Sequence, residues 1–264
     1  MKQLLFILFG CFFAFVSCKK VEKKQVETIQ QKSTIKYAKG FDIIDDNGVK
    51  KLIIKSPYPK AEEVFEYVIV EKNLDKKNNS IQVPIKRIVA TSTTHIPMIE
   101  LLNEAKSIVG FPHTKYISSE KTRALVEVGK IIEIGKEASM NTEILFDLKP
   151  ELVVGFSMNK TNKTLNIINK NGIPVILNGD WLEETPLGRA EWIKFFGILY
   201  NKEKEADSIF NTIESNYLQA KEIAKRATIK PTILSGAIMS KDIWNLPAGG
   251  SFVAQYLQDA NTNY

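Results

Sequence analysis

The sequence is poor in the residues that catalytic and metal sites use most often, with two cysteines and two histidines among 264 residues. It also lacks the nucleophile-elbow, P-loop and H-E-x-x-H patterns that hold a reactive serine, a nucleotide phosphate or a zinc ion. Both cysteines, Cys11 and Cys18, fall at the very start of the chain, so a disulfide framework is not indicated. We therefore expect no enzymatic activity, no resident metal and no cofactor.

Long hydrophobic runs are equally scarce, and the longest is the uncharged stretch at residues 4–15. It follows Lys2 and ends in Val-Ser-Cys at Cys18, which is the layout of an export signal too short to span a bilayer comfortably. Residues 1–17 resemble a bacterial lipoprotein signal, although Phe15 stands where such signals usually carry leucine. We predict a lipid on Cys18 and a protein anchored in the cell envelope, facing the periplasm. An ordinary secretory signal with an incidental cysteine is the alternative.

Charge of neither sign dominates, because the chain has 36 basic and 30 acidic residues and the two signs are interspersed after the first fifty positions. This pattern indicates a solvated surface and argues against a nucleic-acid partner. Residues 18–36 are rich in charge and poor in apolar side chains, so we expect a flexible tether there. We expect the protein to be a monomer.

The folded part begins with a small β unit, predicted over 37–83. Asn47-Gly48 between two apolar runs is a strong hairpin signal. The apolar run at 65–72 predicts a further strand, and we expect the unit to be antiparallel.

From 84 to 200 the pattern alternates short apolar strands with helices. Strands are expected at 87–90, 107–111, 151–156 and 173–181, with helices between them. Asn141 is placed to cap a helix that Lys149-Pro150 ends, and 187–200 reads as one helix. This order predicts an α/β fold with a parallel sheet of βαβ units, forming an N-terminal binding lobe.

A longer helix is predicted over 203–226, within a connecting segment 201–228. A strand at 231–239 and a helix at 249–260 follow it. Because one strand and one helix cannot bury a sheet, 229–264 is expected to be the incomplete start of a second α/β lobe, and the chain alone is expected to bind ligand poorly.

Ligands of open parallel sheets bind beyond the carboxyl ends of the strands. Applied to the predicted strands, this rule gives four loops that contain both histidines and several aromatic and sulfur side chains suited to a large, flat ligand. Each side chain also has a structural alternative: capping a helix, filling the core, or pairing on the surface. The candidates, with one from the second lobe, are Thr94, His95, His113, Tyr116, Met158, Trp181, Arg189 and Trp244.

The order of elements, and the runs RIVATSTTH (87–95), NTEILFDLKPELVV (141–154) and IWNLPAGGSFVAQYLQDANTNY (243–264), resemble the substrate-binding proteins of ABC importers for iron–siderophore complexes, haem and vitamin B12. The resemblance implies two lobes joined by a rigid helix and a metal chelate held between them. It also implies partners, an ABC permease with its ATPase. Glu143 matches the acidic residue that docks onto a permease arginine; its alternative role is to stabilise its own helix.

Two other functions stay open. A zinc or manganese importer receptor would need several histidines and carboxylates around one ion. A surface scaffold lipoprotein would need no cleft for a small molecule.

Overall fold

The computed structural model describes residues 33–74, 80–137, 139–240 and 242–264. Cys18, the export signal and residues 18–32 of the predicted tether lie outside these ranges. Within them, no helix is long and apolar enough to cross a membrane.

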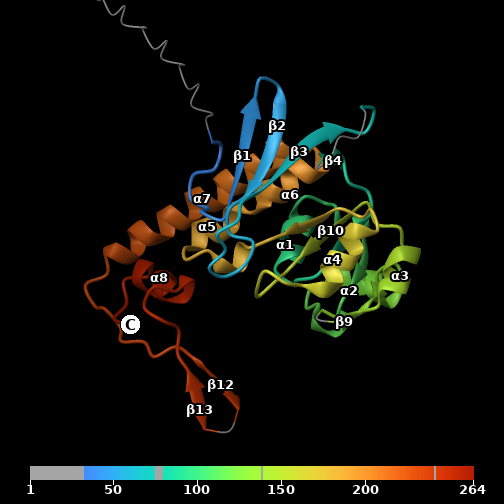
Figure 1. The fold of residues 1–264 in the computed structure, drawn as a ribbon. Helices are drawn as coiled ribbons and strands as arrows, with labels where there is room; N and C mark the ends of the chain where they lie inside the picture. The colour runs from blue at the N-terminus through green and yellow to red at the C-terminus, as the bar shows by residue number, and fades with distance from the viewer. Residues whose placement is uncertain (1–32, 75–79, 138, 241) are drawn as a thin grey trace, which may run out of the picture. The chain divides into compact units, whose positions relative to one another are not determined.

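The first four strands form a mixed sheet in the order β1-β2-β3-β4 (Figure 1). The hairpin predicted at Asn47-Gly48 is confirmed, because these residues join β1 to β2 with φ angles of 54° and 83°. The expectation of a wholly antiparallel unit is wrong, since β4 pairs parallel to β3. An alternating apolar pattern predicts a strand but carries no information on the direction of its neighbour. The bounds are β1 Phe41–Asp46, β2 Val49–Ile54, β3 Phe65–Glu71 and β4 Ser80–Val83.

The larger sheet is parallel throughout and has the order β11-β10-β5-β6-β7, which confirms the predicted α/β fold. Within this sheet, β5 comes first in the sequence, and β6 and β7 follow on one side of it. The chain then crosses to the other side of β5, where it forms β10 and β11. The boundary between β5 and β10 is therefore a topological switch point, where loops diverge and leave room for a ligand. The bounds are β5 Ile88–Ala90, β6 Ile108–Phe111, β7 Ile132–Glu133, β10 Leu152–Gly155 and β11 Val175–Leu177.

Short helices and one small hairpin connect these strands. Asn141 caps α3 as predicted, since its side-chain oxygen accepts the backbone N–H of Ile144 at 3.1 Å. Gly172, with φ 87°, follows the end of α4. The bounds are α1 His95–Leu101, η1 Ala105–Ser107, η2 Thr114–Tyr116, α2 Glu120–Glu127, β8 Gly135–Lys136, β9 Ser139–Met140, α3 Thr142–Asp147, α4 Lys163–Lys170 and η3 Asp180–Leu182.

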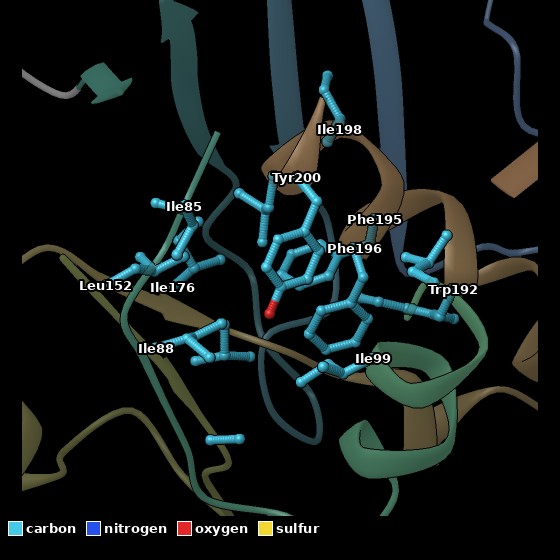
Figure 2. Packing of buried hydrophobic residues seen from close by; sticks show 14 of the residues in the cluster. Ile85, Ile88, Ile99, Leu152, Ile176, Trp192, Phe195, Phe196, Ile198 and Tyr200 are labelled. Carbon is cyan, nitrogen blue, oxygen red and sulfur yellow. The ribbon is translucent and has the colours of Figure 1, made fainter. Parts of the chain in front are cut away.

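The single helix predicted over 187–200 is instead two, α5 Pro186–Glu191 and α6 Ile193–Tyr200. They meet at Trp192, where i→i−3 hydrogen bonds tighten the turn: its N–H donates to Arg189 and its carbonyl accepts the N–H of Phe195. An uninterrupted helical pattern of apolar residues hides such a break. Figure 2 shows how residues of this region pack in the core. The labelled core residues are Ile85, Ile88, Ile99, Leu152, Ile176, Trp192, Phe195, Phe196, Ile198 and Tyr200.

The long helix is confirmed as α7, Glu203–Lys225. The strand expected at 231–239 is wrong in its first half, because Thr232 forms an isolated bridge with Asn263 and pairing as a strand begins at Ala237. An antiparallel hairpin and a helix follow, and the helix contacts α5 and α7. The bounds are β12 Ala237–Ser240, β13 Ile243–Asn245 and α8 Phe252–Asp259.

Candidate functional site

A hollow of about 240 Å³ lies at the carboxyl ends of β5, β6 and β10. Its walls come from the loops that follow these three strands, which are the loops the sequence predicts, and from the turn between β8 and β9. The hollow therefore adjoins the switch point of the parallel sheet, the usual position of a ligand in such folds. Its described lining residues are Thr91, Ser92, Thr93, Phe111, Pro112, His113, Tyr116, Glu137 and Phe156.

The loop after β5 is tied to the loop after β10 by one buried hydroxyl. Thr91 is buried, and its Oγ1 accepts the backbone N–H of Phe156 at 2.8 Å. Thr94 is exposed, lies outside the lining, and its hydroxyl contacts that of Ser92 at 2.9 Å without capping α1. The structure thus places Ser92 and Thr93, rather than Thr94, at the wall of the hollow.

The loop after β6 places two of the candidates, His113 and Tyr116, in the lining of the hollow. His113 has the left-handed backbone conformation, with φ 51°, and its N–H donates to the carbonyl of Gly135 at 2.9 Å. Its ring centroid lies 5.4 Å from that of Tyr116, and the ammonium of Lys115 lies 5.0 Å from the centroid of the Tyr116 ring. Tyr116 is 60% exposed and His113 is half-buried, so the tyrosine ring is the more accessible of the two.

Glu137 also lines the hollow and is missing from the predicted set. It is half-buried, and burial raises the pKa of its carboxyl group. The sequence does hold a signal for it, because Glu137 follows the short apolar run that forms β7. Had that run been identified as a strand, the carboxyl-end rule would have pointed to the loop that carries this carboxyl group.

The loops after β10 and β11 meet through Phe156 and Trp181, whose ring centroids are 5.2 Å apart. Met158 is 59% exposed and lies outside the described lining of the hollow, as does Trp181. Gly179, two residues before Trp181, lies close to another segment of the chain: a Cβ there would come within 1.9 Å of the carbonyl oxygen of Ser56. The segment of the small β unit that contains Ser56 therefore packs directly against the loop that contains Trp181.

His95 does not face the hollow, which corrects the expected position of its side chain. It is completely buried against Phe196, with ring centroids 5.7 Å apart. Burial lowers the pKa of His95, and the nearby carboxylate of Asp180 opposes this effect. Neither ring nitrogen has a hydrogen-bond partner in the described part of the chain. The amide nitrogen of Asn178 and the indole nitrogen of Trp181 are also buried, and neither has a hydrogen-bond partner among the described residues.

Arg189 does not line the hollow either, and its guanidinium is engaged by other parts of the protein. Its guanidinium donates to the carbonyls of Trp181 at 2.8 Å and Glu183 at 3.2 Å, and lies 3.9 Å from the ring centroid of Phe252 on α8. These contacts fix it as a brace between the β11 loop and α8. Trp244, the remaining cleft candidate, is half-exposed on β13 and outside the described lining.

Glu143 stands in the first turn of α3 with its side chain exposed. The partial positive charge of the helix start stabilises a carboxylate there, and exposure leaves it accessible. The described residues contain no group of three or more histidine, cysteine, aspartate or glutamate side chains that could hold a metal ion.

The described chain thus combines a parallel α/β lobe, a hollow at its switch point, a long helix, and a further segment made of a hairpin and a helix. A model of the periplasmic binding protein family matches residues 88–263. The chain therefore belongs to the periplasmic binding protein family.

Known proteins agree with this assignment. An uncharacterized lipoprotein of Methanocaldococcus jannaschii is 27% identical over 84% of the chain, which spans 58% of that relative's length. A periplasmic binding protein from Veillonella parvula superposes with a TM-score of 0.61 at 17% identity, covering 89% of this chain and 68% of that one. The periplasmic haem-binding protein HutB of Vibrio cholerae gives 0.56 at 18% identity, covering 67% and 64%. At these identities the structures support the fold.

Proposed function

We propose that this protein is a lipid-anchored solute-binding protein that captures a metal chelate of the iron–siderophore, haem or cobalamin type. It then delivers the chelate to the permease of an ABC importer, with no covalent chemistry of its own. The observation that carries the proposal is the hollow at the switch point, in a chain that belongs to the periplasmic binding protein family.

The chemistry of the hollow fits a chelate better than a bare ion. Phe156 supplies apolar surface for a flat organic ligand, above the buried Phe111 and Pro112, while His113 and Tyr116 supply groups that contact a metal or a polar edge. A resident zinc ion needs three or four converging protein ligands, whereas the described residues contain no such group. No specific observation favours the zinc or manganese alternative, and the presence of a defined hollow disfavours the scaffold alternative.

Delivery is assigned to Glu143. Its exposed carboxylate at the start of α3 is available to pair with a guanidinium of the permease. The lipid on Cys18 keeps the receptor near that permease and so raises its effective concentration. The solved structures that are similar to this chain include the periplasmic haem-binding protein described above, which supports a ligand of this class.

Equilibrium titration with ferric haem, cyanocobalamin and a ferric siderophore tests the proposal. Saturable binding of one of them supports it. Binding of zinc alone would favour the metal-ion alternative, and binding of none would favour the scaffold.

A further inference from the structure

A second and larger cavity, of about 780 Å³, lies away from the hollow. One wall is formed by β3, β4 and the turn that precedes β3, and the other by α4 and β11. None of its described lining residues is shared with the hollow at the switch point. A volume of roughly 300 to 1,000 Å³ is typical of sites for small organic ligands, so this groove has the capacity of a binding site.

The groove is electrically neutral in the part of the chain that the structure describes. Glu66 and Lys160 are its charged lining residues. Glu66 is paired with Lys51 at 3.3 Å, and Lys160 is paired with Glu63. An anionic or cationic ligand would need an unpaired opposite charge, because removing a charge from water is costly without compensation. The groove therefore favours an uncharged ligand.

A smaller hollow continues the groove, and its charged lining residues are also paired. This hollow of about 220 Å³ shares Ser80, Gly172 and Pro174 with the groove, so the two form one elongated groove. The charged residues that line the smaller hollow, Lys72 and Glu151, are paired with one another at 2.5 Å. An elongated neutral ligand thus finds no unpaired charge among the described lining residues.

One wall carries a row of side-chain amides. Asn162, Asn166 and Asn169 all line the groove and are spaced at i, i+4 and i+7, which places them on one face of α4. The side-chain oxygen of Asn162 caps the helix by accepting the N–H of Leu165 at 3.0 Å. Its NH₂ group is then available to donate to a ligand. No hydrogen bond within the described residues engages the amides of Asn166 and Asn169. Each free amide offers two donors and an acceptor, which matches hydroxyl groups that both donate and accept.

The opposite wall is aromatic. Phe65 and the rings of Tyr58 and Tyr67 line it, and Phe65 keeps 38% of its surface exposed. Tyr67 is fixed across the groove by donating its hydroxyl to the carbonyl of Val175 at 3.1 Å. Aromatic surface facing a row of amides suits a ligand with an apolar face and a rim of hydroxyl groups.

We propose that this groove binds a neutral oligosaccharide, with Asn166 and Asn169 contacting its hydroxyl groups and Phe65 packing against a sugar ring. This site is separate from the chelate hollow and serves a different ligand. For a protein held at the cell envelope, the sugar is either a free oligosaccharide or part of an insoluble surface glycan, and the two sources share this chemistry.

Nuclear magnetic resonance titration with chitotriose, cellotriose and maltotriose tests the site on the ¹⁵N-labelled protein. We expect saturable shifts of the Asn166 and Asn169 side-chain amides with at least one of them. The double variant Asn166→Ala/Asn169→Ala, and separately Phe65→Ala, should weaken that binding at least tenfold. Both asparagines are exposed helix residues and alanine is a better helix former, so the double variant retains its fold.

Two controls separate this site from the proposed function. Lys170→Ala changes an exposed residue of the same helix outside the groove, and His113→Asn changes the chelate hollow; neither should alter sugar binding. Sedimentation with purified insoluble cell-wall glycan then distinguishes a polymer from a free sugar. Absence of saturable binding to every oligosaccharide and to the glycan, or binding that the double variant leaves intact, would overturn the proposal.

Discussion

The carboxylate of Glu191 accepts the backbone N–H of Tyr37 at 2.6 Å, although the two residues are far apart in the sequence. The same carboxylate accepts the N–H groups of Lys36 and Ala38 and pairs with Lys194 at 3.1 Å. Glu191 is completely buried, so these contacts fasten the end of the predicted tether to α5 inside the folded body.

We predict that Glu191→Ala lowers the free energy of unfolding by about 3 kcal/mol, because it leaves buried backbone donors and Lys194 without their acceptor. Urea denaturation measures the loss. Glu184→Ala is the matched control, since Glu184 is exposed and has one surface ion pair with Lys39; it should change stability by less than about 1 kcal/mol. Equal midpoints for the two variants would contradict the account.

A pH dependence of stability is predicted from His95. Burial lowers its pKa in the folded state, whereas the unfolded chain binds a proton near pH 6.5. The full stability is therefore present above about pH 6.5, and it falls as the pH decreases below that value, by up to about 1.4 kcal/mol per pH unit.

The measurement is urea denaturation of the wild type and His95→Gln between pH 7.5 and 5. The variant should show a flatter dependence in this window even if it is less stable overall. Parallel curves for the two proteins would show that His95 does not carry the effect.

We predict that association with the permease requires the negative charge of Glu143, and that Glu143 contributes little to the stability of the fold. Glu143→Ala should reduce association with the permease about tenfold while shifting the thermal midpoint little, because the side chain is exposed. Asp147→Ala, at an exposed position near the end of the same helix, is the control. If both variants associate as the wild type does, Glu143 has no docking role.

Much of the fold is predictable from the sequence, because short β-branched runs and helix caps are local signals. Four strands of the parallel sheet (β5, β6, β10 and β11), the Asn141 cap and the loops around His113 follow from them. The contacts of Arg189 could not be predicted in this way. Its stacking partner Phe252 lies on a distant helix, and no nearby residue indicates that the guanidinium is already occupied.

His95 illustrates the same limit. A histidine at the start of a helix beside predicted ligand loops looks accessible in the sequence. Its burial depends on Phe196, which only the packing of α6 brings against it. Glu137 was missed for a different reason, namely that the two-residue strand β7 before it is too short to be recognised.

Anchoring is predicted to depend on Cys18, which lies outside the described residues. Mass spectrometry of the mature N-terminus should find a lipid on this cysteine, and Cys18→Ser should move the protein from the membrane to the soluble fraction. An unmodified Cys18, or cleavage elsewhere, would remove the anchor from the account.

The central claim is capture of a metal chelate at the hollow beside the switch point, and absorbance titration of the purified protein with ferric haem, cyanocobalamin and a ferric siderophore tests it most directly. His113→Asn is the informative variant, because asparagine tolerates the left-handed backbone at this position. The account predicts saturable binding of one chelate, weakened about tenfold by His113→Asn and unchanged by Asn166→Ala/Asn169→Ala. Absence of binding to all three chelates, or equal affinity of His113→Asn and the wild type, would contradict it.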